Sequence, residues 1–241
     1  MNEFEGRKVV IKALVGSWNG NLNTPTSDKD FKFFVMPTFE DLFNGTVFAT
    51  SFESPEMDFD VHDIRKFGEL IWKSNINFLT VLFSIEAEFN PALTFLFEDP
   101  EKWAQMNIPA LGNSLHGMHE EKMKALHKGT GTTQALVDEF GFDTKQACHA
   151  LRCLFVMEKF FETESVGKAI WFNKGKKRDI LLKVKAGGFT EDEFRGLVKE
   201  WHSKNWGGDL SKAFADSTPE LSRKEELEGR LFEFIKKGVC G

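Results

Sequence analysis

Two short stretches near the N-terminus carry residue types that could bind phosphate and metal. The apolar run 8–15, KVVIKALV, is followed by Gly16 and Ser17, and after a gap of ten residues by Asp28-Lys29-Asp30. A glycine-serine turn after a strand presents backbone N–H groups and a hydroxyl, which can bind a phosphate. Two carboxylates at the start of a strand, two residues apart, point the same way, and Mg²⁺ prefers such carboxylates together with phosphate oxygens. Each stretch alone is also typical of an ordinary surface turn.

A row of basic side chains occurs later in the chain. Lys145, His149 and Arg152 stand at i, i+4 and i+7, so they share one face of a predicted helix. Two fixed cations and an imidazole in one row suit a triphosphate or the end of a nucleic acid. A solvated helix face explains the spacing equally well. The other face carries an apolar stripe of Ala147, Ala150, Leu151, Leu154 and Phe161.

The elements that must position these residues change type along the chain. Residues 8–15, 30–36, 46–52 and 57–64 read as strands, and the short helix 39–43 begins after Thr38 and stops at Gly45. In 57–64, MDFDVHDI, the side chains of Asp58, Asp60 and His62 share one face. Helical spacing then dominates in 65–73, 113–128, 132–140, 143–164, 190–204 and 222–237, with Asp143, Thr190 and Ser222 as N-caps. We therefore predict an α+β fold.

Composition sets limits on the class of protein. The 241 residues carry a net charge of −6, which argues against a chain coated with basic residues for long nucleic acid. Cys148, Cys153 and Cys240 form no CxxC pair, so we expect reduced thiols and a cytoplasmic protein. The N-terminus is too charged for a signal peptide, and no apolar run approaches the length of a membrane span. The chain has 26 Phe and no Tyr.

The combined pattern resembles the DNA polymerase β nucleotidyltransferase superfamily. Val15-Gly16-Ser17, the ten-residue gap and Asp28-Lys29-Asp30-Phe31 match its signature, and a third acid belongs on a nearby strand. We assign that role to Asp60, with Asp58 as the alternative. Three further segments resemble the bacterial and phage branch of the superfamily that is associated with RNA repair, namely 62–84, 140–154 with Lys145, His149 and Arg152, and 178–194.

The resemblance implies a fold and a reaction. Residues 1–108 would form a nucleotidyltransferase catalytic domain with a mixed β-sheet, and residues 109–241 a mainly helical, substrate-binding C-terminal domain across the cleft. The reaction would move a nucleoside monophosphate from an NTP to an acceptor hydroxyl with release of pyrophosphate. Mg²⁺ or Mn²⁺ would be held by Asp28, Asp30 and Asp60, and the NTP or the acceptor by Gly16, Ser17, Lys145, His149 and Arg152.

The identity of the acceptor stays open at this level. An RNA end, tRNA-like, is the acceptor that the resemblance favours. Transfer of AMP to a hydroxyl side chain of a protein is the alternative, and the acidic net charge fits it somewhat better. A third reading, an NTP-binding regulator without catalysis, is disfavoured because a degenerate site need not keep the acidic pair. We expect no membrane partner, and the sequence does not determine the oligomeric state or the NTP.

Overall fold

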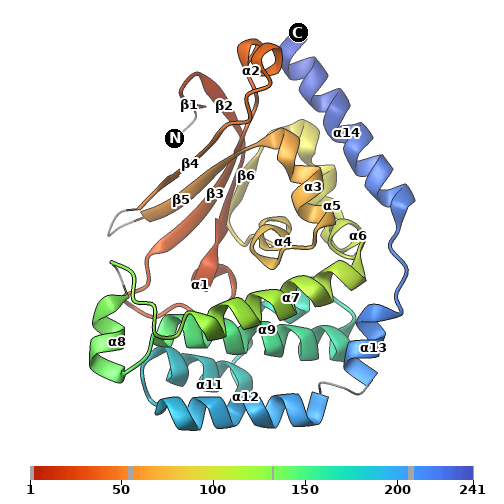
Figure 1. Ribbon diagram of the computed structural model, residues 1–241. Coiled ribbons are helices and arrows are strands. Elements are labelled where there is room, and N and C mark those ends of the chain that lie inside the picture. Colours follow the sequence, from red (N-terminus) through yellow and green to blue (C-terminus); the bar gives the residue numbers. More distant parts are fainter. Residues whose placement is uncertain (1–2, 54–56, 132, 206–208, 241) are drawn as a thin grey trace. The chain divides into compact units, whose positions relative to one another are not determined.

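The chain forms two compact units in the computed structural model (Figure 1), which describes residues 3–53, 57–131, 133–205 and 209–240. The first unit comprises residues 1–107 together with 219–241, and the second comprises residues 108–218. The first unit contains the β-sheet, and the second is helical. The predicted α+β class is thus confirmed at the level of a mixed sheet followed by helices.

The sheet of the first unit is mixed. Its strands are β1 (Glu3–Phe4), β2 (Arg7–Val15), β3 (Lys29–Val35), β4 (Ala49–Phe52), β5 (Met57–Asp63) and β6 (Ala87–Phe89), in the order β1-β2-β3-β5-β4 with β6 also paired to β2. Strands β3 and β5 run parallel, whereas the other pairs are antiparallel. Strand β2 runs antiparallel to β3, whereas β5 runs parallel to β3. The end of β2 and the starts of β3 and β5 therefore lie at the same edge of the sheet.

Successive side chains along each strand point to opposite faces of the sheet, so the two faces carry different residues. One face carries the aromatic-rich core cluster of Leu14, Phe31, Phe33, Val35, Phe48, Phe59 and Val61, which Phe4, Val9 and Trp18 partly cover. The opposite face carries Asp30, Lys32 and Phe34 on β3 and Asp58, Asp60 and His62 on β5, as the register requires. The prediction that Asp58, Asp60 and His62 share a face is confirmed.

Short helices connect the strands of the first unit. They are α1 (Gly16–Asn19), α2 (Phe39–Asn44), α3 (Phe67–Trp72), α4 (Ile76–Leu82), α5 (Phe95–Glu98) and α6 (Pro100–Ala104), with 3₁₀ turns at Ile64–Lys66 and Pro91–Leu93. Helix α2 begins as predicted after its N-cap Thr38, whose hydroxyl accepts from Asp41 N, and it stops before the left-handed Gly45. Phe34 packs edge-to-face on Phe67, with the ring centroids 4.9 Å apart, so α3 covers the face that carries the acids.

The second unit is built around one long helix, α9 (Thr144–Thr163), which packs against α7 (Ile108–Lys124), α10 (Val166–Ile170) and α11 (Lys176–Lys185). The remaining helices are α8 (Gln134–Phe140), α12 (Glu191–Asn205) and α13 (Asp209–Ala215). Asp143 caps α9 as predicted, since its carboxylate accepts from Gln146 N at 2.9 Å. Most of the predicted apolar stripe is fully buried, but Phe161, in the last turn of α9, is exposed.

The C-terminal helix departs from the prediction. Helix α14 (Leu221–Cys240), which we expected in the helical domain of residues 109–241, belongs to the first unit. Lys102 Nζ lies 2.7 Å from a carboxylate oxygen of Glu226, and Glu220 N donates to Met106 O at 2.7 Å. Ser222 is not its N-cap, because the helix already begins at Leu221. These contacts are non-local, so the local helical pattern of the segment could not indicate them.

Smaller differences concern the ends of elements. The strand expected over 46–52 is limited to β4, and the helix expected over 113–128 begins earlier and ends at Lys124. Residue 132, the first of the helix expected over 132–140, and the side chain of Cys240 lie outside the described part of the chain. None of the helices in the described residues is long and apolar enough to cross a membrane.

Candidate active site

The glycine-serine turn and the DxD motif lie side by side in the first unit. Val15 pairs with Asp30 across β2 and β3, so Gly16 begins α1 directly beside the start of β3. Gly16 has a φ of +67°, and a Cβ placed on it would stand 1.8 Å from Asp30 Oδ2. Only glycine fits this close approach and this backbone conformation. The structure therefore explains the glycine of the sequence motif by its contact with the second acid.

Asp28 and Asp30 differ in how the backbone holds them. Asp30 is inside β3, whereas Asp28 lies just before the strand begins at Lys29. Both side chains are partly exposed. Lys29, between them, points to the other side of the strand and its Nζ lies 2.8 Å from Glu86 Oε2. The two carboxylates are thus accessible to a ligand from solvent.

The register of β3 and β5 decides which acid stands next to Asp30. Asp58 is the Cα partner of Asp30, and Asp60 is the partner of Lys32 one side-chain repeat further on. Asp60 Oδ2 accepts a hydrogen bond from Lys32 Nζ at 2.6 Å. The acid of our first choice, Asp60, is therefore ion-paired, and the alternative, Asp58, lies opposite Asp30 on the same face of the sheet.

The carboxylates fit a hydrated Mg²⁺ ion better than a metal enclosed by protein. Within the described ranges, no group of three or more His, Cys, Asp or Glu side chains could hold a metal ion. Mg²⁺ however takes one or two carboxylates and fills its octahedron with water and substrate phosphates. Asp30 and Asp58, with Asp28 beside them, supply oxygen donors of that kind. Gly16 leaves the approach to Asp30 free of a side chain.

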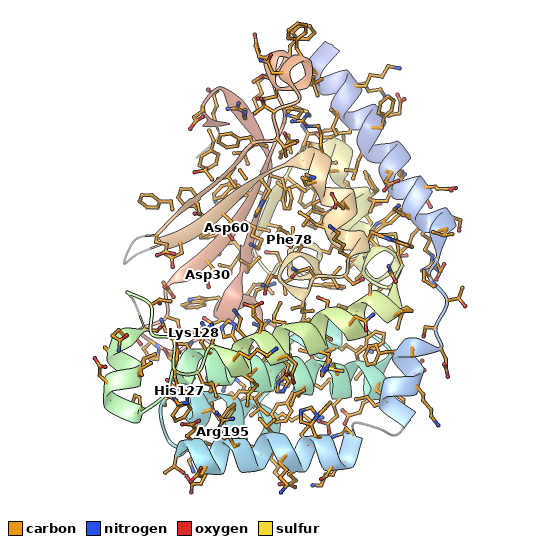
Figure 2. All side chains as sticks on the ribbon, viewed as in Figure 1. Asp30, Asp60, Phe78, His127, Lys128 and Arg195 are labelled. Carbon is orange, nitrogen blue, oxygen red and sulfur yellow. The ribbon has the colours of Figure 1, made fainter. Side chains whose placement is uncertain are left out.

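Phe78, an aromatic side chain of α4, lies against Lys32 and His62 on the sheet face that carries the acids. Lys32 Nζ lies 4.7 Å from the ring centroid of Phe78, and the His62 and Phe78 rings are 5.0 Å apart. Figure 2 shows Asp30, Asp60 and Phe78 in neighbouring parts of the first unit. Desolvation, and after it the charge of Lys32, lower the pKa of the His62 imidazole. His62 is therefore neutral at physiological pH. The sequence pattern did not indicate its contact with Phe78.

The basic row is found on the second unit. Lys145 and His149 are exposed on α9, and Arg152 is partly buried. Two further cations act on the His149 imidazole, Lys122 of α7 and Lys185 of α11, in addition to Arg152 and Lys145. Desolvation, and then these positive charges, lower the pKa of His149, although its side chain is open to solvent. The row is thus part of a basic face that three helices build.

The second unit also contains a pair of histidines that sequence reasoning did not anticipate. His119 is buried, with Nδ1 3.0 Å from Ala150 O and Nε2 3.4 Å from His202 Nε2. Local spacing favours a helix-face position for His119 and indicates no partner for it. The partner, His202, is 83 residues away in sequence, so no local spacing could have indicated the pair.

Comparison with known proteins adds no assignment. No protein-family model and no curated protein matches this chain. The fold, the register of the acidic strands and the basic face of α9 are therefore the observations on which a function has to rest.

Proposed function

We propose that the chain is a metal-dependent nucleotidyltransferase that transfers a nucleoside monophosphate from an NTP to an acceptor hydroxyl. The single observation that carries the proposal is the close approach of Gly16 to Asp30, because it joins the glycine-serine turn to the carboxylate pair of Asp30 and Asp58. A turn of this kind can donate backbone N–H groups to phosphate oxygens. The neighbouring carboxylates suit the metal ion that accompanies an NTP.

Each residue then has a defined task. Gly16 and Ser17 would bind the β- and γ-phosphates, and Asp30 and Asp58 would hold the metal, with Asp28 as a neighbouring carboxylate. A bound Mg²⁺ supplies charge stabilisation for the in-line displacement at the α-phosphorus. The carboxylate nearest the acceptor takes the proton of the attacking hydroxyl. The register makes Asp58 our choice for the third acid, with Asp60 as the alternative.

The basic face of the second unit supports a phosphate-bearing ligand. Lys145 and Arg152 contribute an ammonium and a guanidinium to this face, and a guanidinium can bind phosphate through two parallel hydrogen bonds. His149, neutral beside four cations, can donate or accept a hydrogen bond. We propose that this face binds phosphate groups of an RNA acceptor.

Labelled NTPs, Mg²⁺ and either total RNA or a cell lysate test the proposal in one assay. RNase-sensitive label in RNA supports the RNA acceptor, whereas protease-sensitive label in protein supports the alternative of protein nucleotidylation. Asp30→Asn should abolish the label. Asp192→Asn, at an exposed position on α12, serves as the matched control and should leave it unchanged. Absence of label with every NTP, in the presence of Mg²⁺ or Mn²⁺, would refute the catalytic proposal.

A further inference from the structure

A lysine side chain is buried next to the carboxylates of the first unit. The side chain of Lys32 is only 10% exposed, whereas that of its partner Asp60 is 49% exposed. The ammonium is held by Asp60 Oδ2 at 2.6 Å and by the ring of Phe78, whose centroid is 4.7 Å away. The cation, rather than the acid, is therefore the buried member of the ion pair.

The strand register places this cation next to the proposed metal site. Asp30 and Asp58 are partners, and Lys32 and Asp60 are partners two residues further along the same face. Two residues of a strand span about 7 Å, which a lysine side chain can cover. The face consequently carries three strand carboxylates and one ammonium that belongs to the chain itself.

Electrostatics gives this arrangement a consequence for metal binding. Carboxylates that share a site repel one another, and cations relieve the repulsion. One of the cations is already present as Lys32, and Oδ2 of Asp60 is occupied by its hydrogen bond. A metal ion that approached Asp60 would be repelled by this ammonium and would compete with it for the carboxylate, and loss of the partner is unfavourable for a buried charge.

We propose that Lys32 is a built-in cation that limits this site to one divalent metal ion. Asp30 and Asp58 hold that ion, and Lys32 neutralises Asp60, where a second ion would otherwise bind. The inference rests on the proposed function for the reaction that the site performs, but it concerns the number of metal ions, which can be measured without catalysis.

Titration of the full-length chain with Mn²⁺ and no nucleotide, followed by the electron paramagnetic resonance of free Mn²⁺, tests the inference. The wild type should bind one ion, and Asp30→Asn should weaken that binding at least tenfold. Lys32→Met removes the ammonium and keeps a side chain that can pack on Phe78. It should gain a second ion, or bind the first at least tenfold more tightly.

Lys12 provides the matched control. It lies on β2 opposite Phe33, on the other face of the sheet, and its Nζ is 2.5 Å from Glu88 Oε1 and 5.3 Å from the Phe31 ring centroid. Lys12→Met removes an ion pair and a cation–π contact of the same kind and should leave Mn²⁺ binding unchanged. Lys32→Gln serves in place of Lys32→Met if the methionine variant does not fold by circular dichroism.

The double variant Lys32→Met with Asp60→Asn identifies the carboxylate responsible. It should return to the single ion of the wild type, because the released carboxylate is gone. Equal Mn²⁺ binding by wild type and the Lys32 variant, or a gain that persists in the double variant, would overturn the inference. Loss of nucleotidyl transfer would not by itself overturn the inference. Extra Mn²⁺ binding in the Lys32 variant that disappears in the double variant supports the proposed role of Lys32, even if no NTP is a substrate.

Discussion

Gly16 lies directly against the carboxylate of Asp30, so that a Cβ on Gly16 would stand 1.8 Å from Asp30 Oδ2. The two residues come from an antiparallel strand pair, in which Val15 is the partner of Asp30. The φ of Gly16 is +67°, which is a left-handed conformation that other residues adopt only with strain. Steric space and backbone conformation therefore select glycine here for two independent reasons.

Gly16→Ala should reduce both stability and nucleotidyl transfer. The left-handed conformation costs a residue with a Cβ about 1–2 kcal/mol, and the displacement of Asp30 adds to this. Gly45→Ala is the matched control, because Gly45 also has a φ of +67° but a Cβ on it would meet nothing within 4 Å. Urea unfolding of both variants separates strain from the clash. Equal stability losses, with full transfer in both, would show that the contact with Asp30 is unimportant.

Asp58→Asn and Asp60→Asn should have opposite effects on stability and transfer. Asp58→Asn should abolish transfer with little loss of stability, since it removes a carboxylate from a repelling pair. Asp60→Asn leaves the buried ammonium of Lys32 without its counter-charge and should cost about 1–3 kcal/mol. Thermal unfolding and the transfer assay distinguish them. Full transfer in Asp58→Asn and none in a stable Asp60→Asn would restore Asp60 as the third acid.

The ion pair between Arg7 and Asp41 should make stability depend on pH. Arg7 Nε and Nη2 each donate to Asp41 at 2.7 Å, and this hydrogen bonding holds the pKa of Asp41 well below its usual range. Above about pH 4 the carboxylate is ionised in the folded and the unfolded chain, and its stabilisation is complete. As the pH falls further, the unfolded chain takes up the proton first, so this stabilisation is lost.

Asp41→Asn provides the measurement for that pair. At about pH 7 the variant should be less stable than wild type by roughly 1.5–3 kcal/mol, the size of a hydrogen bond to a charged group. The difference should shrink towards about pH 3, because wild type then loses the same interaction. Urea unfolding at both pH values checks this. A stability difference that does not change with pH would contradict the assigned role of the Asp41 charge.

Arg152→Ala should weaken binding of NTP or of a single-stranded RNA oligonucleotide by roughly 1.5–3 kcal/mol. Arg152→Lys should restore part of the affinity, because the charge is kept and the forked geometry is lost. Arg195→Ala is the control on the same unit, since the exposed Arg195 is ion-paired with Glu191 on α12. Fluorescence titration of the three variants separates the cases. If Arg152→Ala binds both ligands with unchanged affinity, the basic row is only a solvated helix face.

The amino-acid sequence by itself determined the elements whose pattern is local. The β-branched run 8–15, the run 30–36 before Pro37 and the alternating segment 57–64 predicted β2, β3 and β5. The capping of α2 by Thr38 and of α9 by Asp143 follows from a side chain and the backbone three residues later. The buried stripe of α9 follows from helical spacing, which places its apolar residues on one face of the helix.

Only the tertiary structure decided which of these residues meet. The parallel register of β3 and β5 places Asp58 opposite Asp30 and Asp60 opposite Lys32. A shift of two residues would preserve the alternation but place Asp60 opposite Asp30. The packing of α14 with the first unit and the contact of His119 with His202 join segments far apart in sequence. Such pairings depend on the shape of the folded core and on the charges it encloses, which no local pattern of residues contains.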